Sequence, residues 1–157
     1  MRTILFVCTG NSCRSVMAAQ MLKKLLGPGN KKIEVLSGGV SAISGMQPTE
    51  YTLKLLQKEG INGLAHRSSP ISKAIIEKAD LILVMEQFHK DRILEIIPEA
   101  KGKVHLLREF EKDPKEVVEA QIPDPIGKPL EVYERTFELI KEALQDLMKW
   151  MRESGWV

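Results

Sequence analysis

The sequence of 157 residues predicts an α/β fold, a three-layer sandwich with a four-stranded parallel sheet and helices on both faces. Two observations predict it. Short runs that are apolar without alternation are typical of strands buried on both faces. These runs alternate with longer segments in which apolar residues recur every three or four positions, as in amphipathic helices. Strands separated by helices need crossover connections, which make the sheet parallel.

The first strand is expected at residues 3–7, a continuous apolar run rich in residues that favour strands. A helix should follow from Ser15 to Leu26, with Met17, Met21, Leu22 and Leu25 as its apolar stripe. The turn-forming residues 27–30 end that helix. A second strand is expected at 33–36, leading into a polar turn at 37–39.

A second helix is expected from about Pro48 to Lys58, closed by Gly60. The dipeptide Ser69-Pro70 is typical of a helix start, with serine as the N-cap and proline in the first turn. This short helix should end near Ala79. Residues 81–85 then form a third apolar run, which predicts another buried strand.

A helix around His89 to Ile97 should stop at Pro98, and residues 103–107 supply the fourth strand. The acidic, proline-containing segment 110–129 is interpreted as a long loop. A last helix is expected from Leu130 to about Arg152, and its apolar side chains are spaced by three and four: Phe137, Ile140, Leu144, Leu147 and Met151. With no repeat or boundary evident, residues 1–157 are expected to form one domain.

Composition limits the function. The 23 Lys and Arg residues nearly balance the 21 Asp and Glu residues, so the net charge is +2 and a nucleic-acid partner is not expected. No apolar stretch approaches the roughly 20 residues that cross a bilayer, so no membrane association is expected. The apolar start is too short for a signal peptide, which favours a cytoplasmic location. A monomer or weak homodimer is expected.

The segment from Cys8 to Ser15 carries the chemistry. Cys8 and Arg14 bracket a glycine-containing loop between a buried strand and the start of a helix. Backbone N–H groups of such a loop and the positive end of the helix dipole can hold a tetrahedral oxyanion. Arg14 can close this cradle with a planar fork of donors. The same groups favour an ionised Cys8 sulfur, to which the Ser15 hydroxyl can donate.

A general acid is required for the leaving group, and Asp124 is the candidate because prolines at positions 123 and 125 restrict its backbone. Asp124 would protonate the leaving group first and then activate water. A turn residue is the alternative interpretation. Asp113-Pro114 is a second such pair, which spacing alone barely excludes.

The segment Cys8–Ser15, with Asp124-Pro125 far downstream, closely resembles the low-molecular-weight protein tyrosine phosphatase family. Three further stretches resemble the family's blocks: Ser37–Val40, His66–Ser68 and Ala79–Met85. The resemblance implies a cysteine-dependent hydrolase in which Cys8 forms a phosphocysteine, Arg14 binds phosphate and Asp124 is the acid. It also implies that Asn11, with Ser37 and His66, supports the loop. It implies no metal and no organic cofactor.

Phosphorylated proteins are the substrates that the resemblance implies. The phosphate-binding residues carried over are Thr9, Gly10, Asn11, Ser12, Cys13 and Ser15, with Ile43 and Ile126 at the pocket rim. Family members that act on phosphotyrosine usually have an aliphatic residue in place of Ser12 and aromatic rim residues. A bacterial branch with threonine at the Ser12 position removes phosphate from phosphoarginine. Phosphotyrosine is predicted first, and phosphoarginine is a close alternative.

Three other interpretations concern redox chemistry, binding without catalysis, and metals. Thioredoxin-coupled arsenate reductases share the Cys8–Ser15 loop but need further cysteines, and residues 85–89 contain none. A non-catalytic phosphopeptide-binding module would be expected to lack Cys8 or Asp124. Cys13 is either a small buried residue or, as the family implies, a resolving thiol that forms a disulfide with oxidised Cys8. His66, His89 and His105 are scattered, and such single histidines are more often structural than metal ligands.

Overall fold

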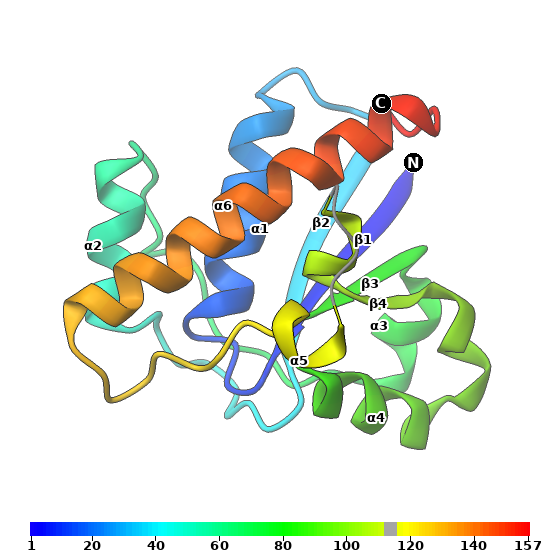
Figure 1. The fold of residues 1–157 in the computed structure, drawn as a ribbon, viewed down its shortest axis with the longest axis horizontal. Helices are drawn as coiled ribbons and strands as arrows, with labels where there is room; N and C mark the ends of the chain where they lie inside the picture. Colours follow the sequence, from blue (N-terminus) through cyan, green and yellow to red (C-terminus); the bar gives the residue numbers. More distant parts are fainter. Residues whose placement is uncertain (112–115) are drawn as a thin grey trace.

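The computed structural model describes residues 1–111 and 116–157, and its centre is a parallel sheet (Figure 1). Its four strands lie in the order β2-β1-β3-β4, and every neighbouring pair is parallel. The strands are β1 Arg2–Cys8, β2 Ile33–Gly39, β3 Leu81–Val84 and β4 Val104–Leu106. The predicted parallel sheet is confirmed.

Helices cover both faces of the sheet, which confirms the three-layer prediction (Figure 1). One face packs against the helices α1 Arg14–Leu26, α2 Glu50–Lys58 and α6 Leu130–Glu153. The other face packs against α3 Lys73–Lys78 and α4 Gln87–Ile96. The short elements are η1 Pro98–Lys103, η2 Leu107–Phe110 and α5 Val117–Ala120. No helix in the described residues has the length and apolar character that crossing a membrane requires.

The central strand β1 explains why the apolar runs show no alternation. Ile4 and Phe6 belong to the core on the α1 and α6 side, whereas Leu5 and Val7 belong to the core on the α3 and α4 side. All four side chains are fully buried. Because successive side chains of a strand point to opposite faces, a strand covered on both faces must be apolar at every position.

Strand β2 continues three residues beyond its predicted end. Residues Ser37 to Gly39 were expected to form a turn, but they pair in register with Phe6 to Cys8 of β1. The glycines that suggested a turn instead allow close approach, because a Cβ on Gly38 would lie 3.1 Å from Ile71 Cγ2. The extension brings the end of β2 alongside Cys8.

The predicted start of α3 at Ser69-Pro70 is wrong. Pro70 lies in an isolated parallel bridge with Gly39, and the Ile71 N–H donates to the Gly39 carbonyl at 3.0 Å. The helix begins at Lys73, and its N-cap is Ser72, whose Oγ accepts from the Ile75 N–H at 3.3 Å. A tertiary contact to the sheet therefore overrides the local start signal.

Other boundaries differ from the predictions by a few residues, and two of these differences bear on the site. Helix α4 begins at Gln87, so His89 lies inside its first turn instead of starting it. The segment expected as one long loop contains the short helix α5, preceded by η2. The Asp113-Pro114 pair lies outside the described residues.

Candidate active site

The loop between β1 and α1 starts at the carboxyl end of the central strand, where parallel α/β sheets place their ligands (Figure 1). Asn11 occupies the left-handed region with φ 53°, and its side chain is fully buried. Its Nδ2 donates to Ser37 Oγ at 3.0 Å, and its Oδ1 accepts from the Ser69 N–H at 3.0 Å. His66 Nε2 lies 2.9 Å from the Asn11 carbonyl. Ser37 and His66 therefore both contact Asn11, and their role in supporting the loop stays a prediction.

Three carbonyl groups of the loop accept hydrogen bonds from neighbouring segments. Val40 N–H donates to the Cys8 carbonyl at 2.9 Å, and Ser41 N–H to the Thr9 carbonyl at 2.9 Å. Thr49 N–H donates to the Ser12 carbonyl at 3.0 Å.

The loop N–H groups have no such partners. Those of residues 10–13 donate to no acceptor within the described chain. With most of its carbonyls bound and its N–H groups available, the loop is suited to an anion.

Gly39 lets the end of β2 approach the loop. A Cβ built on Gly39 would lie 2.5 Å from the Thr9 carbonyl oxygen and 2.9 Å from the Asn11 backbone nitrogen. Both contacts are with backbone, which a small side-chain movement cannot relieve. The shape of the loop therefore depends on the absence of a side chain at this position.

Cys8 and Ser15 meet inside the loop. The Cys8 sulfur lies 2.9 Å from Ser15 Oγ, and both side chains are buried. Asn11 Nδ2 donates to Ser15 Oγ at 2.8 Å, so the serine hydrogen is left for the sulfur. A donor directed at the sulfur stabilises a thiolate more than a thiol. The structure thus brings Cys8, Asn11 and Ser15 together inside the loop.

Arg14 is fully buried, and four acceptors surround its terminal nitrogens. Nη1 donates to Glu86 Oε2 at 2.6 Å and to the Ile122 carbonyl at 2.7 Å. Nη2 donates to Thr9 Oγ1 at 3.3 Å and lies 3.5 Å from Asp124 Oδ2. The buried Nε has no hydrogen-bond partner among the described residues. An orphaned charged donor beside unpaired N–H groups fits a bound oxyanion.

The contact between Asp124 and Arg14 joins segments that are far apart in the sequence. Asp124 Oδ1 accepts from the Ile126 N–H at 3.0 Å, which orients the carboxyl group. The side chain of Asp124 is 34% exposed, so it can reach both the guanidinium and solvent. This position suits a group that exchanges a proton first with a leaving group and then with water.

Sequence reasoning missed Glu86 and His89. Glu86 directly follows β3, and its contact with Arg14 reflects the pairing of β1 and β3. A polar residue at a strand's carboxyl end was the available signal. His89 was set aside as scattered, yet its Nε2 lies 2.9 Å from Thr9 Oγ1. The pKa of His89 is lowered from 6.5 to about 3, mainly by burial and to a smaller extent by the Arg14 charge.

Cys13 contacts a different set of residues from Cys8. Its sulfur lies 3.4 Å from Thr49 Oγ1 and 3.5 Å from the hydroxyl of Tyr133 on α6. Burial raises the pKa of Tyr133 to about 12, so its hydroxyl keeps its hydrogen. Both cysteines are buried free thiols, and the role of Cys13 as a resolving thiol stays a prediction.

The remaining predicted positions lie at the surface. Ile43 is 72% exposed and Ile126 55% exposed, and Ser12 is partly buried. The Ser12 hydroxyl lies 3.8 Å from the Cys13 sulfur. The rim role of the two isoleucines stays a prediction.

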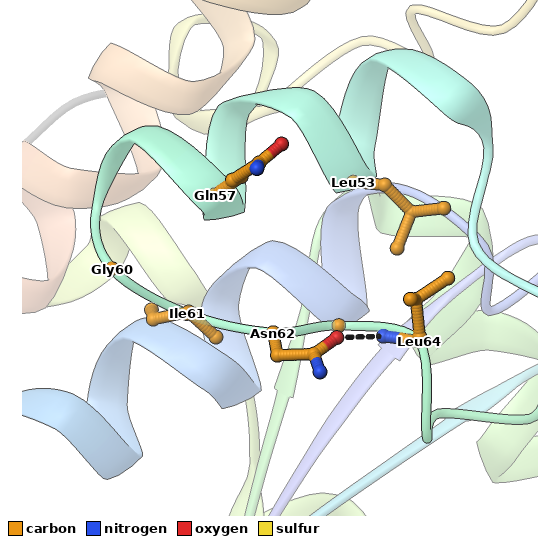
Figure 2. A pocket seen from close by; sticks show the side chains of 7 residues that line it. Leu53, Gln57, Gly60, Ile61, Asn62 and Leu64 are labelled. Atoms are coloured by element: carbon orange, nitrogen blue, oxygen red, sulfur yellow. Dashed lines mark hydrogen bonds between the residues drawn. The ribbon is translucent and has the colours of Figure 1, made fainter.

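A pocket of about 520 Å³ lies between α2 and the segment that follows it (Figure 2). Leu53 and Leu64 point toward one another across it, and it shares no lining residue with the Cys8 loop. Among the described residues, no group of three or more His, Cys, Asp and Glu side chains could hold a metal ion.

Comparison with solved structures supports the fold. The arginine phosphatase YwlE from Geobacillus stearothermophilus superposes with a TM-score of 0.86 at 37% identity, covering 98% of this chain and 95% of that one. A low molecular weight phosphotyrosine phosphatase from Vibrio cholerae gives a TM-score of 0.88 at 28% identity, covering 99% of both chains. The three-layer α/β architecture is therefore shared over nearly the whole length.

Sequence comparison identifies the family. A protein-arginine-phosphatase of G. stearothermophilus is 44% identical over 130 residues, covering 83% of this chain and 82% of that protein. The low molecular weight protein-tyrosine-phosphatase Wzb of Escherichia coli is 32% identical over 142 residues, covering 89% and 88%. The sequence model described as low molecular weight phosphotyrosine protein phosphatase matches residues 3–155. The chain belongs to the low molecular weight phosphotyrosine protein phosphatase family.

Proposed function

We propose that the chain is a protein phosphatase that transfers the phosphoryl group of its substrate to Cys8 and then to water. The observation that carries the proposal is the surroundings of the Cys8 sulfur. The sulfur accepts from Ser15 within a loop whose N–H groups at residues 10–13, like Arg14 Nε, have no partner among the described residues and can bind an oxyanion. Family membership supports a cysteine-dependent hydrolase with this loop as its site.

In the first step the Cys8 thiolate attacks phosphorus, and the bond from phosphorus to the substrate's leaving atom breaks. The loop N–H groups and Arg14 stabilise the charge on the three phosphoryl oxygens. Asp124 donates its proton to the leaving atom. The products of this step are the free substrate side chain and a phosphocysteine, with Asp124 ionised.

In the second step water attacks the phosphocysteine, and Asp124 takes one proton from that water. The bond from sulfur to phosphorus breaks, inorganic phosphate leaves, and Cys8 returns to the thiolate. Ser15 donates a hydrogen bond to the sulfur as it regains its negative charge. Thiolate and carboxylic acid are both restored, so the cycle needs no cofactor.

Phosphotyrosine is the substrate that the family as a whole favours. Relatives named as protein-tyrosine-phosphatases include Wzb of E. coli and, at 33% identity over 154 residues, EpsP of Ralstonia nicotianae. The exposed isoleucines at positions 43 and 126 offer aliphatic surface on which a phenyl ring can be buried.

Phosphoarginine is the second candidate, and Ser12 is the residue that favours it. An aliphatic side chain is expected at that position for phosphotyrosine, whereas this chain has a small hydroxyl group, as in the threonine-bearing branch. Two relatives named as protein-arginine-phosphatases support it, at 44% identity over 130 residues and 32% identity over 150 residues.

The deciding experiment compares hydrolysis of phosphotyrosine and phosphoarginine peptides, with Cys8→Ser as the blank. We expect phosphate release above the blank on at least one peptide, and trapping of the intermediate as phosphocysteine by rapid acid quench. The ratio of the two kcat/KM values assigns the substrate. Equal rates for wild type and Cys8→Ser on both peptides would contradict the proposal.

The residue at position 12 can be tested in the same assay. Ser12→Ile should lower kcat/KM for phosphoarginine relative to phosphotyrosine, because it replaces a hydroxyl by an aliphatic side chain within the Cys8–Ser15 loop. Ser41→Ala serves as the control, because Ser41 is exposed and bonds to the loop through its backbone N–H, which the substitution keeps. An unchanged ratio in Ser12→Ile would remove Ser12 as the selecting residue.

A further inference from the structure

Arg14 belongs to a closed ring of hydrogen bonds that also includes the loop residue Thr9. Arg14 Nη1 donates to Glu86 Oε2, and Arg14 Nη2 donates to Thr9 Oγ1. Thr9 Oγ1 lies 2.9 Å from His89 Nε2, and His89 Nδ1 lies 3.0 Å from the backbone nitrogen of Glu86. The four residues thus form a ring of contacts between the end of β1, the start of α1 and the start of α4.

The position of the hydrogen on the His89 imidazole follows from the donor that Nδ1 contacts. The Glu86 N–H can only donate, so His89 Nδ1 must accept and carries no hydrogen. The imidazole of His89 is fully buried and remains neutral, since burial and the Arg14 charge lower its pKa to about 3. Its single hydrogen is therefore on Nε2, and His89 donates to Thr9 Oγ1.

Thr9 Oγ1 therefore accepts twice, from His89 and from Arg14, which uses both lone pairs of a hydroxyl oxygen. The bond from His89 sets the direction of the lone pair that Arg14 uses. Without it, the hydroxyl group could turn about its Cβ–Oγ bond and no longer present a fixed acceptor to Nη2.

The hydrogen bond between Thr9 and Nη2 matters because two other acceptors of the guanidinium both bind a single atom, Nη1. Glu86 and the Ile122 carbonyl both bind Nη1, about which the guanidinium plane can pivot. Asp124 is 3.5 Å from Nη2, but its proposed role requires it to gain and lose a proton. Thr9 is the anchor at Nη2 that keeps its charge state throughout the reaction.

We propose that His89 is a positioning residue for the phosphate: acting through Thr9, it holds the Arg14 guanidinium in the orientation that leaves Nε for the bound anion. This inference rests on the proposed role of Arg14 in phosphate binding. His89 itself touches neither the nucleophile nor the acid in any contact within the described residues.

Two substitutions at position 89 distinguish the hydrogen bond of His89 to Thr9 from its hydrogen bond to Glu86. The amide nitrogen of His89→Gln can occupy the place of Nε2 and still donate to Thr9. The shorter His89→Asn can only replace Nδ1, so it keeps an acceptor for Glu86 N–H but loses the bond to Thr9. His105→Asn makes the same change at a partly exposed histidine that contacts Glu109 and serves as the control.

The first measurement is the Kd of inorganic phosphate by titration calorimetry, which does not depend on turnover. We expect His89→Asn and Thr9→Val to weaken binding about tenfold each, as for a lost hydrogen bond in a charged network. His89→Gln and His105→Asn should stay within about threefold of wild type. Adding His89→Asn to Thr9→Val should weaken binding no further, because Thr9→Val already removes the acceptor through which His89 acts on Arg14.

The second measurement separates KM from kcat with p-nitrophenyl phosphate, and Tm is recorded for every variant. His89→Asn should raise KM and lower kcat, and His89→Gln should restore both toward wild type. A lower Tm without a change in the Kd of phosphate, or additive losses in the double variant, would overturn the positioning role. If wild type itself bound no phosphate, the proposed function would fail instead.

Discussion

At the scale of single residues, the chemistry comes from side chains that are neighbours in the sequence. Cys8, Arg14 and Ser15 lie within eight positions, and their setting between a buried strand and a helix start predicts an anion loop. Their contacts follow from the strand, the loop and the helix that carry them. This part of the site could be predicted because it depends on one short stretch of chain.

The partners of Arg14 could not be predicted in the same way. Glu86 and His89 reach the loop only because β3 pairs with β1, and that register depends on the whole sheet. Asp124 was predicted through its neighbouring prolines and the family resemblance. Its contact with Arg14 spans 110 positions, and no spacing rule describes it.

The first prediction concerns Gly39. Gly39→Ala places a Cβ 2.5 Å from the Thr9 carbonyl oxygen, so the loop must shift, and we expect kcat/KM to fall by at least about 10²-fold. Gly102→Ala is the matched control, because a Cβ there meets nothing within 4 Å and the backbone is not left-handed. Kinetics with p-nitrophenyl phosphate measures both. Near wild-type kcat/KM in Gly39→Ala would show that the loop tolerates the shift.

At the scale of elements, periodicity predicted most helices and strands, because burial on one stripe or on both faces leaves a clear pattern. The apolar residues predicted for α6 are all buried. The start of α3 was wrong for a physical reason, since Ser69-Pro70 is used in a bridge to Gly39. Local capping rules cannot detect such a bridge, because its partner lies about 30 residues away in the sequence.

The second prediction concerns α6, which packs against α1 on one face of the sheet. Leu144 is fully buried there, and we expect Leu144→Ala to lower the free energy of unfolding by about 2–5 kcal/mol. Val132→Ala, on the same helix but 39% exposed, should cost less than about 1 kcal/mol. Urea unfolding followed by circular dichroism gives both values, and equal losses would place Leu144 outside the core.

At the scale of the whole molecule, several groups link stability to pH in one direction. Burial lowers the pKa of His66, and burial with the Arg14 charge lowers the pKa of His89 to about 3. The pKa of Glu34 is lowered mainly by a hydrogen bond from Lys78. The pKa of Glu59 is lowered mainly by a hydrogen bond from Lys141. In each case the unfolded chain binds protons more readily than the folded chain, so acid favours unfolding.

The third prediction separates His89 from the carboxylates by its pH window. A histidine with an unfolded pKa of about 6.5 and a folded pKa of about 3 contributes stability that is complete above pH 6.5 and is lost progressively as the pH falls toward 3. Over that interval the folding equilibrium constant can fall up to about tenfold per pH unit. The carboxylates contribute stability that is present above their ordinary pKa of 4.5 and is lost only as the pH falls below it.

Urea unfolding at pH 7.5 and pH 5.0 tests this prediction. Wild type should be less stable at pH 5.0, and His89→Gln should show a smaller difference between the two pH values, whatever its absolute stability. His105→Gln, at a partly exposed histidine paired with Glu109, should keep the wild-type difference. Among the described residues, Arg14 and Glu86 are the charged groups that act on His89 or lie within 4.0 Å of it. If His89→Gln retained the full difference, the buried imidazole would not be the group that senses acid.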